Sequence, residues 1–140
     1  MVYLTRRFYF SASHRLFKPE LTDTENEKIF GKCSNPNGHG HNYVLEVTVI
    51  GEQDPETGYV IDLDELKNII VNNLINAVDH KNLNIDVDFM KGVIPTVENI
   101  VVQFWNKVEN KIKAKNRNLY SLKLFETENN VAEYRGKNGY

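Results

Sequence analysis

Alternating apolar and polar positions predict two long strands in the first third of the chain. Within residues 2–14 the even positions are mostly apolar and end on His14. Within residues 39–50 the odd positions begin with His39 and His41 and continue with the series Tyr43, Leu45, Val47 and Val49. Successive side chains of a strand point to opposite faces, so each pattern is typical of a strand with one buried face. We therefore expect histidines at the end of this face in both strands.

Two later segments repeat apolar residues at helical spacing. The first, over about residues 62–78, opens on Asp62 with Glu65 three positions later, a variant of the capping box. Its predicted apolar stripe is Leu63, Leu66, Ile70, Leu74 and Val78. The second begins at Thr96, which can cap a helix, and is expected to end within residues 111–115. Its predicted buried stripe is Val101, Phe104, Trp105, Val108 and Ile112.

The remaining segments complete an α+β pattern. Residues 15–38 are polar and rich in turn formers, which predicts a long loop, and loops of this length are commonly functional. Residues 119–127 alternate as a strand, with Tyr120, Leu122, Leu124 and Glu126 on one face, and a short strand is expected at 131–134. A buried, unpaired carboxylate is costly, so Glu126 should reach solvent or meet a cationic or hydrogen-bond-donating partner.

Length and composition narrow the class of protein. One hundred and forty residues suit a single domain, 1–140. The net charge of −2 gives no basic signal, so we expect no nucleic-acid partner. The lone cysteine, Cys33, cannot form an intramolecular disulfide, which fits a reducing compartment. No apolar run approaches the roughly 18 residues of a membrane span, and we find no apolar signal region, so we expect a cytoplasmic protein without a membrane partner.

The histidines and the cysteine are the candidate chemistry. His39 and His41 stand two apart in a strand and can aim at one ion, and His14 can add a third imidazole. Three protein ligands leave one position open on zinc, as in catalytic sites. The alternative is ordinary: a histidine can be a half-buried core residue, and Cys33 a small buried apolar one. Thr96 and Glu98 can likewise be no more than a cap and a first-turn acid.

Several motifs, spread over nearly the whole chain, resemble the eukaryotic 6-pyruvoyl-tetrahydropterin synthase family. They are Phe10-Ser11-Ala12-Ser13-His14-Arg15, Phe30-Gly31-Lys32-Cys33, Asn35-Pro36-Asn37-Gly38-His39-Gly40-His41-Asn42-Tyr43, Asp79-His80-Lys81-Asn82-Leu83, Thr96-Val97-Glu98-Asn99 and Glu126-Thr127. The resemblance implies the tunnelling fold, in which an antiparallel four-stranded sheet carries two helices on one face and sheets join into a barrel in the oligomer. It also implies a homohexamer of two stacked trimers, with active sites at subunit interfaces.

The resemblance further implies a zinc-dependent lyase that converts 7,8-dihydroneopterin triphosphate to 6-pyruvoyl-tetrahydropterin and triphosphate. The implied roles are zinc ligand for His14, His39 and His41, general base for Cys33, proton relay for Asp79 and His80, pterin anchor for Glu126, and pocket lining for Thr96 and Glu98. No external reductant is needed, because the side chain is oxidised while the ring is reduced, so we expect no nicotinamide cofactor. Arg15, Lys18, Lys32 and Lys81 are candidate triphosphate contacts, although each can equally be a solvated charge.

Three other functions remain open on the sequence. The related 6-carboxy-tetrahydropterin synthases usually have fewer residues between the cysteine and the histidine pair than the five found here. Relatives that cleave the side chain place a glutamate near the cysteine position, where this chain has Cys33. A non-catalytic zinc-binding or pterin-binding module is the third possibility, but it leaves the thiol, the Asp79–His80 pair and the inner-face Glu126 unexplained.

Overall fold

A computed structural model describes residues 1–139 and contains one five-stranded sheet. Its strands lie in the order β3-β1-β2-β4-β5. They are β1 (Val2–His14), β2 (His39–Gly51), β3 (Lys81–Asn82), β4 (Arg117–Thr127) and β5 (Asn130–Tyr134). Strands β1–β2, β2–β4 and β4–β5 pair antiparallel, but β3 pairs with β1 in parallel. The predicted four-stranded antiparallel sheet is therefore wrong, because a two-residue polar strand leaves no alternation to detect.

The register of β1 and β2 brings the two histidine ends together. His14 lies directly opposite His39, and Ala12 lies opposite His41. Even positions of β1 and odd positions of β2 therefore share one face of the sheet. Phe10 and Tyr43, also a cross-strand pair, stack on this face with ring centroids 4.7 Å apart.

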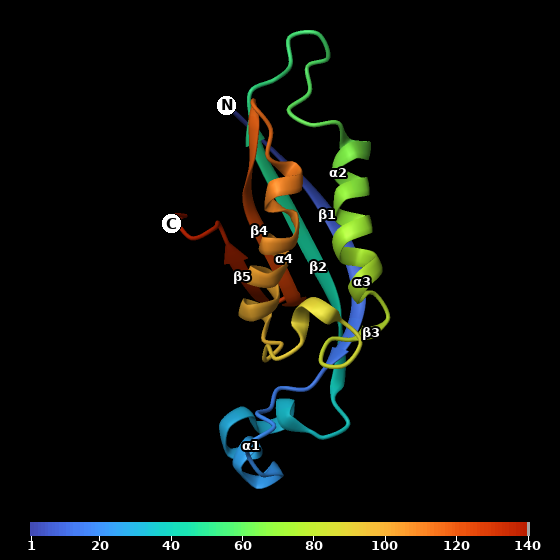
Figure 1. Cartoon of the computed structure of the whole chain (residues 1–140), viewed down its shortest axis with the longest axis vertical. Helices are drawn as coiled ribbons and strands as arrows, with labels where there is room; N and C mark the ends of the chain where they lie inside the picture. The colour runs from blue at the N-terminus through green and yellow to red at the C-terminus, as the bar shows by residue number, and fades with distance from the viewer. Residues whose placement is uncertain (140) are drawn as a thin grey trace.

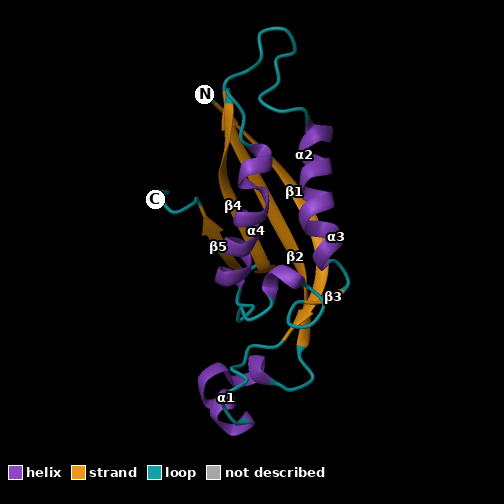
Figure 2. Cartoon of the chain, in the orientation of Figure 1, coloured by secondary structure: helices purple, strands orange, loops and turns teal. Residues whose placement is uncertain are grey.

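Two helical segments cover that face, as predicted (Figure 2). The first runs through α2 (Leu63–Ile70), a π-helical turn (Val71–Ile75) and α3 (Asn76–Val78), and the second is α4 (Val97–Ile112). The predicted stripe of α4 is buried throughout, and that of α2–α3 is buried except for Leu63, which is 47% exposed. Among residues 1–139, no helix is sufficiently long and apolar to cross a membrane.

The expected loop 15–38 instead contains a helix, α1 (Asp23–Phe30), followed by a 3-10 turn, Gly31–Ser34, which we call the cysteine turn. Both project beyond the end of the sheet where β1 finishes and β2 begins (Figure 1). The helix was missed because it buries Asn26 rather than an apolar stripe. The available signal was the Thr22–Glu25 capping box, in which both reciprocal hydrogen bonds are present.

A bulge in β4 corrects one further prediction. The register of β2 and β4 shifts between Thr48 and Val49, so Leu119 packs into the core. Tyr120 instead contacts Tyr3 edge-on, with ring centroids 4.7 Å apart. The prediction that Tyr120 continues the apolar face is therefore wrong, since an inserted residue reverses the alternation before it.

Candidate active site

The three histidines form a compact group at the end of the helix-covered face. One ligand atom from each of His14, His39 and His41 lies within 4.8 Å of the others. Nε2 of His14 is 3.1 Å from Nε2 of His39. The strand register explains this, because a directly opposed pair and its neighbour two residues along are close on one face. The group could hold a metal ion.

The protonation of His14 suits a ligand role. Its ring is buried, and Nδ1 donates a hydrogen bond to the carbonyl oxygen of Pro95 at 2.8 Å. A carbonyl only accepts, so Nδ1 carries the proton and the Nε2 lone pair faces the group. Burial lowers the pKa of His14 to about 4. The imidazole is therefore neutral at pH 7, as metal coordination requires.

His41 contributes an unsatisfied nitrogen. Its Nε2 is buried and has no hydrogen-bond partner among residues 1–139, and burial lowers its pKa as well. A buried polar atom without a partner is unusual and calls for an explanation. Coordination of a cation by His14, His39 and His41 would satisfy this nitrogen, so the residues fit a metal site of the three-histidine type.

Glu126 lies between the histidines and a surface hollow. Its carboxylate oxygens are 4.0 Å from Nε2 of His14 and 3.8 Å from Nε2 of His41. The side chain remains 21% exposed and lines a hollow of about 760 Å³, the Glu126 hollow. Its partial exposure gives the carboxylate the solvent access that the sequence required of it.

Thr96 and Glu98 line the same hollow. The Thr96 hydroxyl also accepts a hydrogen bond from the backbone of Asn99 at 3.2 Å, which is the ordinary role of a helix cap. Glu98 is exposed in the first turn of α4, where a negative charge complements the helix dipole. Thr96 and Glu98 therefore stabilise the start of α4 and also line the Glu126 hollow.

Cys33 is half-buried on the cysteine turn. Its carbonyl oxygen accepts a hydrogen bond from the backbone of Leu16 at 2.8 Å, two residues after His14. The thiol itself has no hydrogen-bond partner among the described residues. The turn is thus connected to the end of β1 through its backbone.

Asp79 and His80 are in contact with each other but line a different part of the surface. Oδ1 of Asp79 is 3.0 Å from Nδ1 of His80 and accepts from the backbone of Ser11 at 2.9 Å. The Ser11 hydrogen bond is the main cause of the lowered pKa of Asp79, with His80 adding to it. The His80 side chain is 83% exposed and lines a hollow of about 540 Å³ beside Lys81 and Asn82, the His80 hollow, which His41 of the three-histidine group also lines.

Sequence reasoning missed two groups at this centre. Pro95 offers the carbonyl that orients His14, and only the tertiary fold brings residue 95 to β1. Tyr43 carries a buried hydroxyl without a hydrogen-bond partner among residues 1–139, and burial together with Glu126 raises its pKa. Its place two residues after His41 on the same face was visible in the sequence, but the apolar periodicity marked it only as core.

Fold and site together define an α+β protein with a three-histidine group beside a carboxylate-lined hollow. The family model for 6-pyruvoyl tetrahydropterin synthase matches residues 3–137. A 6-pyruvoyl tetrahydrobiopterin synthase of Pongo abelii is 48% identical over 134 residues, covering 96% of this chain and 91% of the relative. That of Homo sapiens is 46% identical with the same coverage. The chain belongs to the 6-pyruvoyl tetrahydropterin synthase family, and the relatives are enzymes.

A solved structure agrees with the sequence relatives. The 6-pyruvoyl tetrahydropterin synthase of Caenorhabditis elegans superposes with a TM-score of 0.87 at 40% identity, over 97% of this chain and 96% of that chain. The family membership and enzyme class expected from the sequence motifs are therefore confirmed.

Proposed function

We propose that this chain is a zinc-dependent lyase that converts 7,8-dihydroneopterin triphosphate to 6-pyruvoyl-tetrahydropterin and inorganic triphosphate. The observation that carries the proposal is the three-histidine group beside Glu126 at a hollow large enough for a small ligand. The names of the relatives support the same reaction.

Zinc is the metal that the donor set favours. His14, His39 and His41 would hold it through neutral imidazole nitrogens, and a fourth position would stay open for substrate. When bound, zinc supplies a Lewis acid that stabilises negative charge on a substrate oxygen. The Pro95 carbonyl would keep His14 in the ligating tautomer.

Glu126 orients the pterin in this proposal. An ionised carboxylate can accept two hydrogen bonds, from the 2-amino group and a ring N–H. Its partial exposure at the hollow leaves it accessible to a ligand. Thr96 and Glu98 line the same hollow and would contact the ring or its substituents.

Cys33 would take a proton from the substrate side chain, after which triphosphate can leave. Asp79 lies 3.0 Å from Nδ1 of His80 and would orient the imidazole, so that the pair can pass protons.

The Asp79–His80 pair does not line the Glu126 hollow, which supports an active site shared between subunits. His80 is largely exposed and lines a hollow distinct from the Glu126 hollow. We infer that the pair of one subunit serves the site of another, in a homohexamer of two stacked trimers whose sheets join into a barrel. We retain the expectations of a single domain, 1–140, and of a cytoplasmic location.

Product analysis tests the proposal. The purified protein, loaded with zinc, is incubated with 7,8-dihydroneopterin triphosphate, and the pteridine is identified by mass spectrometry. A pyruvoyl product is expected, and a chelator should abolish it until zinc is restored. A carboxy or hydroxymethyl product would instead assign one of the related reactions, and the absence of any product would favour a non-catalytic binding module.

A further inference from the structure

The cysteine turn raises a physical problem, since it lies in an excursion outside the sheet (Figure 1). A general base must sit within hydrogen-bond reach of the proton that it removes. Cys33 is nonetheless on a four-residue 3-10 turn, with only the Ser34 side chain buried there. Specific contacts must therefore fix the turn relative to the three histidines.

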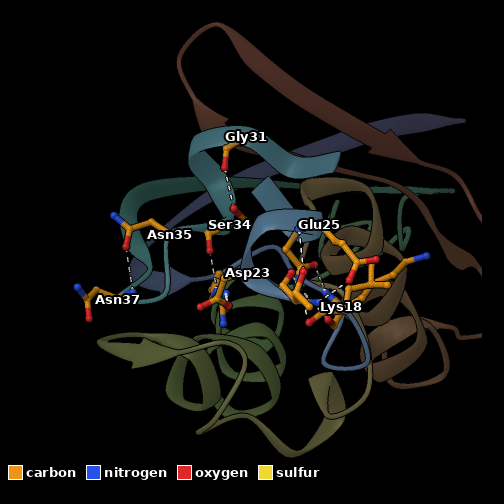
Figure 3. Close-up of polar contacts among 11 residues, drawn as sticks. Lys18, Asp23, Glu25, Gly31, Ser34, Asn35 and Asn37 are labelled. Atoms are coloured by element: carbon orange, nitrogen blue, oxygen red, sulfur yellow. Dashed lines mark hydrogen bonds and ion pairs between the residues drawn. The ribbon is translucent and has the colours of Figure 1, made fainter. Parts of the chain in front are cut away.

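The contacts come from the residues that follow His14. The Leu16 N–H donates to the carbonyl oxygen of Cys33 at 2.8 Å, and Nε of Arg15 donates to the carbonyl oxygen of Ser34 at 2.8 Å. Two consecutive carbonyls of the cysteine turn thus accept hydrogen bonds from Arg15 and Leu16, the two residues that follow β1. The Ser34 hydroxyl closes the turn by donating to the carbonyl oxygen of Gly31 at 2.8 Å (Figure 3).

Arg15 is itself held from several directions. Its backbone N–H and C=O both bond the side chain of Asn84, each at 2.8 Å. Its guanidinium carbon lies 4.0 Å from the ring centroid of Phe17, and Nη2 donates to Oδ1 of Asp23 at 3.0 Å. The side chain is only 16% exposed. The planar guanidinium is therefore directed at Ser34 with little freedom.

The excursion of residues 15–38 that contains α1, which we call the lobe, is held together by hydrogen bonds of its own. The buried Asn26 side chain accepts from the backbone of Lys18 at 2.8 Å and donates to the carbonyls of Lys18, Leu21 and Thr22. These bonds close the segment that precedes α1. Asp23, at the start of α1, is largely exposed, so its ion pair with Arg15 contributes little by itself. The hydrogen bond to Ser34 is the more important contact.

We propose that Arg15 is a positioning residue for Cys33, holding the cysteine turn in register with the three-histidine site through the Nε–H bond to Ser34. This inference rests on the proposed function for Cys33, and it replaces the alternative in which Arg15 is a contact for triphosphate. A lysine at position 15 distinguishes the positioning role from the triphosphate-binding role. A lysine keeps the positive charge but cannot reproduce the Nε–H geometry.

The test compares Arg15→Lys with Lys28→Met, which removes an exposed charge from the same lobe. In steady-state assays of the zinc enzyme, Arg15→Lys should lower kcat about 10-fold or more with KM for 7,8-dihydroneopterin triphosphate nearly unchanged. Zinc content should match that of Lys28→Met, and the thermal midpoint should fall only by the few degrees that loss of about one hydrogen bond costs. An unchanged kcat, or a raised KM with kcat retained, would overturn the positioning role.

A second readout is independent of turnover. Cys33 is the only cysteine of the chain, so iodoacetamide reports on it alone. The alkylation rate should change several-fold in Arg15→Lys and in Arg15→Gln, and remain at the wild-type value in Lys28→Met. Equal rates in all four proteins would refute the inference. A wild-type protein that forms no pyruvoyl product would refute the proposed function, while the alkylation comparison would still decide the role of Arg15.

Discussion

The protonation of His14 follows from where its ring lies. In a buried site the imidazolium form of His14 lacks the hydration that would stabilise its charge in water. The neighbouring His39 and His41 also disfavour the added charge. The hydrogen bond to Pro95 opposes this shift only in part. His14 consequently stays unprotonated to a lower pH than an exposed histidine in the folded, metal-free protein.

Acid should therefore destabilise the apo-protein through His14. The folded pKa is about 4, against 6.5 for the unperturbed group, so the unfolded chain binds the proton more readily between these values. As pH falls from 6.5 to about 4, the free energy of unfolding should drop by up to about 3 kcal/mol. Denaturant unfolding of chelator-treated protein measures this. A His14→Gln variant should give a flatter profile, and parallel profiles would contradict the assignment.

The role of Cys33 can be separated from that of the candidate metal ligands by substitution. Because it lies on a turn outside the three-histidine group, Cys33→Ala should leave zinc content unchanged. Loss of a general base should reduce turnover at least about 100-fold. Metal analysis and a pteridine assay on the same sample provide both readings, with His39→Ala, which should lose zinc, as the comparison. Full turnover in Cys33→Ala would remove the thiol from the mechanism.

The turn between the cysteine and β2 shows how one element sets the geometry of another. Gly38 adopts a φ of +70°, and a Cβ there would lie 2.9 Å from the carbonyl oxygen of His14. Its N–H donates to the carbonyl oxygen of Asn35 at 2.8 Å, which closes the turn. The close approach of this glycine to His14 lets β2 begin directly opposite the end of β1.

Gly38→Ala should therefore damage the site as well as the fold. Gly58 provides a matched control, since its φ is +79° but nothing lies within 4 Å of the position that a Cβ would take there. Both substitutions carry the backbone strain of a positive φ, about 1–2 kcal/mol, and only Gly38→Ala adds the steric clash. Unfolding experiments should show the larger loss for Gly38→Ala, together with weaker zinc binding. Equal losses and equal zinc affinity would refute this account.

In the whole molecule, one sheet supports two separate surfaces with candidate chemistry. The Glu126 hollow lies at α4 and the β4–β5 end, whereas the His80 hollow is lined by β1, β3 and the start of β2, including His41. Cys33 is on a third feature, the lobe that contains α1. An arrangement of this kind suits sites completed by assembly rather than within one subunit.

Mixed oligomers test the shared site. Cys33→Ala and His80→Ala proteins should each be inactive, but co-assembled at equal amounts they should recover about a quarter of wild-type activity if the two residues come from different subunits. The proportion follows because each interface site draws two subunits at random. Co-purification of both variants through an affinity tag carried by only one of them confirms co-assembly. No recovery in a co-assembled sample would place both residues in one subunit.

The sequence by itself determined the local patterns: the strands that carry the histidines, the α4 stripe and the motifs of the family. These follow from periodicity and residue chemistry, which depend on near neighbours in the chain. Helix α1 escaped because its stability comes from a capping box and a buried asparagine rather than from an apolar face. The parallel strand β3 escaped because its hydrogen bonds are made to a distant strand.

Only the tertiary structure decided which groups meet. Three contacts join residues that are distant in sequence or separated by an excursion. They are the pairing of His14 with His39, the hydrogen bond from His14 to the Pro95 carbonyl, and the hydrogen bond from Arg15 to Ser34. The tertiary structure likewise decides that His80 and Glu126 line different hollows. Residue type fixes what a side chain can do, but packing of the whole chain fixes the distances over which it acts.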